Sequence, residues 1–473
     1  MDLIDMLDKL RAAEEGHAVR RTRYRHVHLE TRPLVIVGYY LAGEQDAPVG
    51  IMWGTDRDHP HLMSVPEPRN RDDRFHELKK FAEALVDFIE RTPAGRCPQL
   101  VFANDATAAW LLRMVGRWTR YLPVDGPHPV DPAIRKMGNY LSLLNERWEV
   151  PGGATVLTMT SQLSAVYANG QLASEDQNLR TQLAWIQPPP GLSGADAARV
   201  AELEPPVGPL SHPDWDDKVL MPAISEYGAA KKFVEAAVAE AAAQVHRRVR
   251  RELLPGWNVT WDALEVLRRI PEAPHAANRW AADVNSWSKQ APNVASGDRR
   301  FRIHRSPAQN ADRLRAIERA IDEFEHHQAL DDPAILARHE AAGRAITGTV
   351  IESHPDAKAQ VGPKKAARPL IRIRTTTPPR IPIGTAVRLT ADERVIATIL
   401  DKTDDDVTLQ ITNGANTTPT RGRVPTRGAE VGFTSTTPGG FVRRDEPEPG
   451  AEYVDPTPWT HRVPMPAGAD SDG

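Results

Sequence analysis

The spacing of apolar residues changes at Ala345, and no other feature constrains the fold of this chain as strongly. From Leu314 to Phe324, apolar residues recur every three or four positions, which is typical of an amphipathic helix. After Ala345, apolar and polar residues alternate, and strand-like runs follow one another with turn residues between them. We therefore expect an antiparallel helical stalk that leads directly into a small all-β barrel over residues 344–441.

Helix starts and a helix stop can be read inside the stalk. Ser306 and Asp332 each have a side chain that can accept a free backbone N–H, and each is followed by a proline, whose missing donor costs nothing at the first helical position. Gly343 provides the left-handed residue that ends many helices. We assign residues 218–343 to a helical domain that includes this stalk.

Composition limits the class of protein. A chain of 473 residues has room for roughly two to four domains. Its single cysteine, Cys97, excludes an internal disulfide framework and a structural zinc site made of several cysteines, which fits a reducing cytoplasm. No apolar run approaches the ~18 residues that cross a bilayer. We expect a cytoplasmic protein without a membrane partner.

Charge is strongly segregated, although the formal net charge is only −4. Residues 241–305 hold twelve Lys and Arg against six acids, and residues 344–380 hold eight against two. Residues 445–473 reverse the sign, with seven acids and one arginine. Local basic patches can therefore face phosphate or an acidic partner, and residues 442–473 are expected to be a disordered acidic tail.

Residues 1–186 predict an α/β domain. The first strand, Leu34 to Ala42, is almost entirely apolar, as is usual for a central strand. Two shorter strands, a core-facing helix, a fourth strand and a further helix follow at 49–55, 61–65, 75–89, 99–103 and 105–118. This β-β-β-α-β-α order resembles that of ribonuclease H-like domains.

The same resemblance draws attention to Asp105, which follows the fourth strand. Ribonuclease H-like nucleases keep a metal-binding carboxylate there, and they need paired carboxylates for two Mg²⁺ ions, with one acid in the middle of the first strand. Here the first strand contains no acid. Asp105 is therefore interpreted as a helix N-cap, and alternatively as a catalytic residue partnered by Glu44 or Glu30.

Prolines concentrate between residues 187 and 217, and we expect a linker or a wrapping arm there. Beyond it, Tyr227 to Leu254 predicts one continuous, alanine-rich helix. The tryptophans that follow are spaced as core residues of helices rather than as platforms for bases. They are Trp257, Trp261, Trp280 and Trp287.

Three groups of arginines are candidates for contact with a nucleic-acid backbone. Two groups lie in or after the predicted helices, and the third occupies one face of a barrel strand, because alternate residues of a strand point the same way. The candidates are Arg247, Arg248, Arg250, Arg251, Arg299, Arg300, Arg302, Arg372 and Arg374. Cations near a helix C-terminus are also favourable without a ligand, and a solvated outer face explains the strand pair equally well. Clusters that share one groove would bind single strands without reading bases.

Signatures of cofactor chemistry are missing from the sequence. No glycine-rich phosphate loop ends in Gly-Lys-Ser or Gly-Lys-Thr. No two histidines have the spacing of four that places two imidazoles on one helical face beside a third ligand. We expect neither a cofactor nor a bound metal ion.

The stalk from Ser306 to Gly343 and the barrel from Ala345 to about Phe441 resemble the stalk and 1B barrel of Upf-like superfamily 1 helicases. The resemblance rests on the order and period of the elements over about a quarter of the chain. In that family the module precedes the phosphate loop and grips single strands, and the present chain ends where the ATPase core would begin. The resemblance implies a non-catalytic nucleic-acid-binding accessory protein that works with a helicase or ATPase subunit in genome defence or DNA processing. The alternatives are a metal-dependent nuclease of ribonuclease H-like fold and a protein-interaction scaffold.

Overall fold

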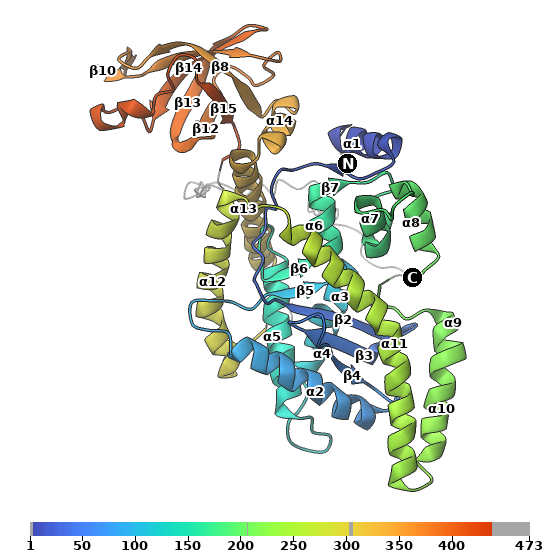
Figure 1. The fold of residues 1–473 in the computed structure, drawn as a ribbon. Coiled ribbons are helices and arrows are strands. Elements are labelled where there is room, and N and C mark those ends of the chain that lie inside the picture. The colour runs from blue at the N-terminus through green and yellow to red at the C-terminus, as the bar shows by residue number, and fades with distance from the viewer. Residues whose placement is uncertain (1–2, 206, 302–305, 438–473) are drawn as a thin grey trace, which may run out of the picture. The chain divides into compact units, whose positions relative to one another are not determined.

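The computed structural model describes residues 3–205, 207–301 and 306–437. They form a mixed α/β structure with a five-stranded sheet and a closed six-stranded barrel (Figure 1). The expected acidic tail at 442–473 and the candidate Arg302 lie outside the described residues.

The sheet is built around the apolar strand that the sequence predicts. Its strands are β2 (Leu34–Leu41), β3 (Glu44–Gly54), β4 (His61–Ser64), β5 (Leu100–Phe102) and β6 (Val156–Thr158). The strand order is β4-β3-β2-β5-β6, with β4, β3 and β2 antiparallel and β2, β5 and β6 parallel. β2 is buried along almost its whole length, because helices cover both faces of the sheet.

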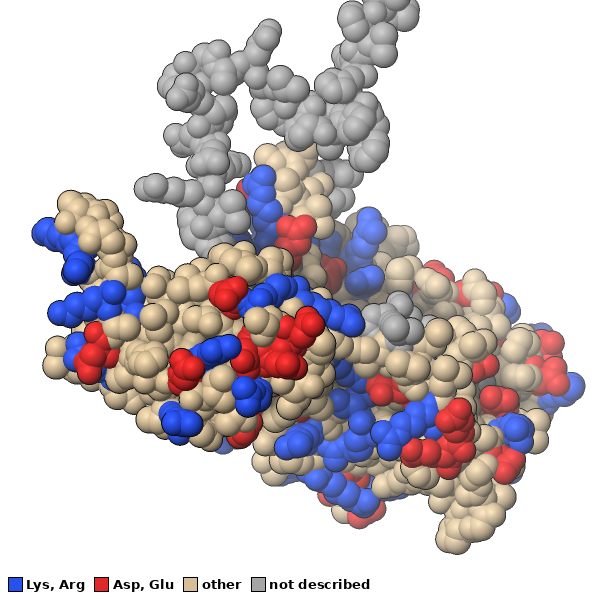
Figure 2. Space-filling model, turned by 90° about the horizontal axis from the view of Figure 1, so that it is seen from above, with Lys and Arg blue, Asp and Glu red and all other residues tan. Residues whose placement is uncertain are grey.

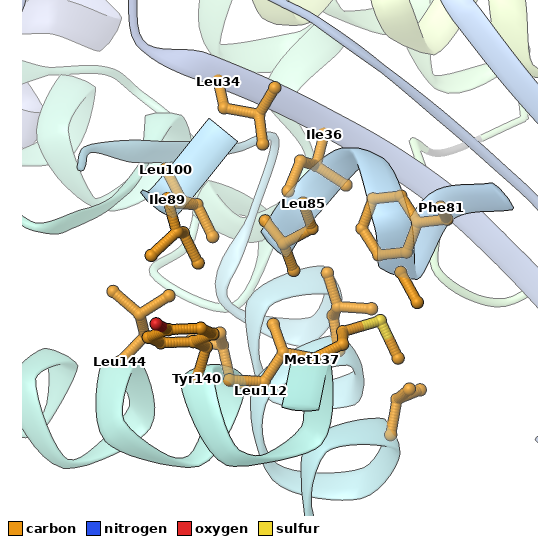
Figure 3. Close-up of a cluster of buried hydrophobic side chains, with 14 of the residues drawn as sticks. Leu34, Ile36, Phe81, Leu85, Ile89, Leu100, Leu112, Met137, Tyr140 and Leu144 are labelled. Carbon is orange, nitrogen blue, oxygen red and sulfur yellow. The ribbon is translucent and has the colours of Figure 1, made fainter. Parts of the chain in front are cut away.

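One face of the sheet packs against α2 (Arg71–Glu90) and α5 (Pro132–Trp148). Figure 3 shows Leu34 and Ile36 of β2 facing Leu85 of α2 and Met137 of α5. Asn70 caps α2, since its side chain accepts hydrogen bonds from the backbone N–H groups of the first turn. The expected core-facing helix is confirmed.

The opposite face packs against α6 (Met159–Val166) and α11 (Glu235–Arg268), a helix that continues through Pro255. Gly50 of β3 allows this close approach, because a Cβ atom there would lie 2.4 Å from Cγ1 of Val249. α11 thus completes the core of the sheet. The sequence assigns α11 to a helical domain at residues 218–343, but the helix shares a hydrophobic core with residues 1–186. The single helix expected from Tyr227 is also divided, because that residue belongs to α10 (Met221–Ala230).

Residues 187–217 form a wrapping arm rather than a free linker. The arm contains α8 (Gly194–Glu202) and α9 (Pro213–Trp215). The buried Asn104 side chain donates to the carbonyls of Val207 (2.8 Å) and Gly208 (3.0 Å), and the Tyr40 N–H donates to the Pro209 carbonyl (2.9 Å). The arm is therefore fixed to the ends of β2 and β5.

α12 (Pro274–Ala295) and α13 (Pro307–Asp331) form a long antiparallel helix pair, and α13 also contacts the short helix that follows it. Near the start of α12, the His275 ring stacks on the His327 ring at 4.6 Å between centroids. The predicted apolar seam of α13 is only partly covered, because Leu314 is 61% exposed and Ile321 39% exposed, whereas the Phe324 ring lies under Arg279 of α12. α14 (Pro333–Ala341) follows directly as a short helix capped by Asp332.

The predicted β-barrel is confirmed. Its strands are β8 (Ala345–His354), β11 (Leu370–Thr375), β12 (Ala386–Leu389), β13 (Asp392–Lys402), β14 (Asp406–Asn413) and β15 (Glu430–Thr434). They close in the order β11-β14-β13-β12-β15-β8, all antiparallel. Inward side chains such as Val350, Ile373, Leu409 and Phe433 form a separate hydrophobic core.

The remaining elements are shorter or flank these units. They are α1 (Leu3–Glu15), β1 (Val19–Arg20), α3 (Asp105–Ala109), a π-helical stretch (Trp110–Val115), α4 (Gly116–Thr119), β7 (Tyr167–Ala168), η2 (Glu175–Gln177), α7 (Leu179–Ile186), η3 (Asp216–Leu220), β9 (Lys358–Val361), β10 (Lys364–Ala367) and η4 (Thr418–Arg423). Within the described ranges, none of the helices is both long enough and apolar enough to span a membrane.

Candidate nucleic-acid interface

The barrel region carries an excess of positive charge. Residues 344–437 contain fourteen Lys and Arg against nine Asp and Glu. The β8–β11 ladder continues at its end into a hairpin of β9 and β10, since His354 pairs with Leu370 and Val361 pairs with Lys364. The basic segment between β8 and β11 is thus a β-hairpin.

The hairpin displays three lysines. Lys358, Lys364 and Lys365 are all exposed. None of the three has a carboxylate within ion-pair distance among the residues that the structure describes. Lys and Arg side chains gather at the end of the barrel that carries this hairpin (Figure 2). An ammonium group without a carboxylate partner can give its full charge to a phosphate.

Arg372 and Arg374 lie on the outer face of β11, as the alternation predicts, but they are not free cations. Nη2 of Arg372 lies 3.0 Å from Oδ2 of Asp406, and Nε of Arg374 lies 3.3 Å from Oδ1 of the same carboxylate. Glu352 lies 3.6 Å from Arg372 on the other side. The strand register explains this pairing, because Arg374 is opposite Asp406 and Arg372 is opposite Glu352.

The shared carboxylate only partly neutralises the two arginines. Their side chains remain 41% and 64% exposed, whereas that of Asp406 is 11% exposed. A guanidinium group has five N–H donors, so both arginines keep donors that face solvent. The outer face of β11 can still contact an anion, but with less charge than two unpaired arginines would supply.

The four arginines on α11 differ in their surroundings. Arg247 forms an ion pair with Glu240 at 2.7 Å, and Arg248 donates to the Val219 carbonyl at 3.0 Å. Arg250 and Arg251 are exposed, and within the described ranges they form no ion pair.

The third group follows α12. Arg299 pairs with Glu146 of α5 at 2.5 Å and lies over the Phe301 ring, while Arg300 is exposed. α11 covers one face of the sheet, whereas α5 and α12 pack on the other. The helices that carry these two clusters therefore pack on opposite faces of the sheet, so a groove shared by both clusters gains no support from the packing.

Asp105 lies in the first turn of α3, but the N-cap is Asn104, whose side chain accepts from the Thr107 N–H. The Asp105 carboxylate accepts hydrogen bonds from the hydroxyls of Thr158 (2.5 Å) and Ser161 (2.9 Å) instead. The two other acids considered with it are engaged elsewhere, Glu44 by Arg69 at 2.6 Å and Glu30 by Arg96 at 3.8 Å. No group of three or more His, Cys, Asp and Glu among the described residues could hold a metal ion.

The hairpin lysines are the main residues that the sequence reasoning left out of its candidate set. The sequence does mark these lysines, because Pro355 and Pro369 bracket a short basic segment between two predicted barrel strands.

Comparisons of the chain with protein-family models, with curated proteins and with solved structures found no match.

Proposed function

We propose that the barrel and its β9–β10 hairpin bind single-stranded nucleic acid through the phosphate backbone. The observation that carries this proposal is the set of three exposed lysines, Lys358, Lys364 and Lys365, on a hairpin that continues the strand bearing Arg372 and Arg374. Lysine and arginine neutralise phosphates and release the counterions condensed on the strand, which favours binding to any sequence.

The polar face beside the arginines favours phosphate contacts over base recognition. β14 presents Thr408 and Gln410 next to Arg372 and Leu370 in the ladder. Hydroxyl and amide groups of this kind position a backbone, whereas reading bases of a single strand requires stacking rings and hydrogen bonds to base edges. Binding with little preference for base sequence is the expected outcome.

The proposal also covers the role of the five-stranded sheet and the partner of the chain. The order β4-β3-β2-β5-β6 supports a ribonuclease H-like assignment, and the apolar β2 with a hydroxyl-bonded Asp105 favours a non-catalytic role for it. A helical stalk ahead of a barrel supports an accessory protein that works with a superfamily 1 ATPase in genome defence or DNA processing. Co-purification of such an ATPase, with unwinding that depends on this chain, tests the partnership.

Binding itself is tested by titrating the full chain with single-stranded DNA and RNA at several salt concentrations. The logarithm of affinity should fall linearly with the logarithm of salt, by about 0.7 per neutralised phosphate. Replacing Arg372 and Arg374 by glutamine should reduce that slope by about 1 and weaken all sequences alike, by about threefold to tenfold at low salt. A matched control replaces Arg11 and Arg199, which are exposed and ion-paired on α1 and α8. Undetectable binding at low salt would leave the protein-interaction scaffold as the better reading.

Neutralising Asp406 should have the opposite effect. Asp406→Asn keeps the shape of the side chain but removes the charge that both arginines contact. We expect a twofold to fivefold tighter complex and a steeper salt slope, on the order of 1 additional phosphate contact. Filter binding or anisotropy measures this change, and Asp392→Asn, which removes a carboxylate paired with Arg394, is the matched control. Weaker binding by Asp406→Asn, with an intact fold by circular dichroism, would contradict the assignment of this face.

A further inference from the structure

A groove lies at the end of the sheet where β2 and β5 begin. Its volume is about 920 Å³, within the range of small-molecule sites. The approach to β2, the β3–β4 turn and the end of α2 with the following loop contribute its walls. A neighbouring hollow of about 480 Å³ shares Glu30, Thr31 and Arg96 with it, so the two hollows are continuous around these residues.

Each hollow contains a stacked pair of rings. In the larger one, the His61 ring stacks on Trp53 with centroids 5.7 Å apart and planes inclined by 26°. In the smaller one, His28 stacks on Trp280 at 4.8 Å and 25°. His61 is exposed, whereas Trp53 is buried beneath it. A planar heterocycle can extend such a stack, and each stacked base contributes about 1–3 kcal/mol in single-strand complexes.

Two arginines in the groove have unused donors. Nη2 of Arg32 donates to the Thr55 hydroxyl at 3.1 Å, and Arg32 forms no ion pair within the described part of the chain. Arg96 is 65% exposed and lies only at 3.8 Å from its nearest carboxylate, Glu30. By contrast, Arg91 is held by Asp87 at 2.6 Å.

Besides Glu30 and Asp87, the larger hollow is lined by Asp56, whose carboxylate already has hydrogen-bond partners. Asp56 accepts from the Asp58 N–H at 3.0 Å and lies 2.9 Å from Nδ1 of His59, and these bonds lower the pKa of its carboxyl group. The carboxylates therefore have local partners, while Arg32 and Arg96 both line the larger hollow, and Arg96 lines the smaller one as well.

We propose that this groove binds a nucleoside monophosphate unit, with the base stacked on a ring pair and the phosphate held by Arg32 and Arg96. The unit can be a free nucleotide or the phosphorylated end of a single strand, since both offer the same base and the same phosphate. This site is separate from the barrel and does not depend on the proposed function of the barrel.

Isothermal titration of the full chain with AMP and with adenosine tests the proposal. AMP should bind saturably and more tightly than adenosine, because the phosphate adds charge-assisted hydrogen bonds. Arg32→Gln/Arg96→Gln should weaken AMP binding about tenfold or more, and His61→Ala should weaken it about fivefold or more. Arg11→Gln/Arg199→Gln, which removes the same charge from ion pairs on α1 and α8, should bind AMP as the unaltered chain does.

A competition experiment shows whether the bound unit is a free nucleotide or the end of a strand. A 5′-phosphorylated tetranucleotide that displaces AMP, while its unphosphorylated form does not, identifies a strand end, and failure of both to displace AMP identifies the free nucleotide. Absence of saturable AMP binding in the millimolar range overturns the proposal. Equal AMP affinity for Arg32→Gln/Arg96→Gln and the unaltered chain, both folded by circular dichroism, overturns it as well.

Discussion

Replacing Lys358, Lys364 and Lys365 together by glutamine is expected to weaken the binding of single-stranded DNA and RNA by about thirtyfold to a hundredfold at low salt. The effect is large because these lysines are exposed and, in the described structure, have no carboxylate partner that already holds their charge. If each lysine neutralises one phosphate of a single strand, the salt slope should fall by about 2. The loss should exceed that of the Arg372 and Arg374 pair, whose charge Asp406 shares.

Fluorescence anisotropy over a range of salt concentrations measures both quantities on the full chain. The matched control replaces three exposed lysines outside the barrel, Lys80, Lys218 and Lys289, and so changes the net charge equally. A hairpin variant that binds like this control, with the same salt slope, would show that β9 and β10 do not contact the strand. Tight binding retained by both would move the interface to another surface.

Asp283→Ala is expected to reduce the free energy of unfolding by about 3–5 kcal/mol, because it leaves a buried charge unpaired. Asp283 of α12 is only 6% exposed. Its Oδ1 lies 2.5 Å from Nη2 of Arg147 in α5, and its Oδ2 accepts from the Ala154 N–H at 2.7 Å just before β6. Without the carboxylate, the Arg147 guanidinium and the Ala154 N–H lose their hydrogen-bond acceptor at a site that is shielded from water.

Urea unfolding followed by circular dichroism measures the loss. Asp298→Ala is the control, since that residue is exposed and, among the residues that the structure describes, accepts a hydrogen bond from the Ser296 hydroxyl alone. It should change the free energy of unfolding by less than about 0.5 kcal/mol. An equal, small effect of both substitutions would mean that α12 is not fixed to the sheet through Asp283.

The sheet could be predicted where local pattern and tertiary environment agree. The apolar run of β2 needs helices on both faces, and both are present. The stalk shows where that logic fails. Leu314 and Phe324 have the spacing of a buried seam, but this spacing does not say which helix covers the seam. In the structure α12 contacts α13 at Phe324, whereas Leu314 stays exposed. Arg279 of α12 lies over the Phe324 ring of α13, and the spacing of residues within one helix cannot predict such a contact between two helices.

The candidate site divides in the same way. Strand alternation correctly predicted that Arg372 and Arg374 share a face. Their shared partner Asp406 could not be foreseen, since it depends on the register between β11 and β14. The two helical arginine clusters could not be placed either, because the side of the sheet on which α11 packs is decided by Gly50 and the other long-range contacts of the core.

The completion of the sheet by α11 has a consequence for how the chain is made. During synthesis β2 leaves the ribosome long before Leu264, yet Val35 and Leu264 belong to the same buried cluster. One face of the sheet therefore waits uncovered while the intervening segments are translated, a period in which apolar surface invites aggregation or chaperone binding. A recombinant fragment that stops before Glu235 would lack α11 and leave its part of that face uncovered, so the smallest piece that can be expected to fold around β2 must extend through α11.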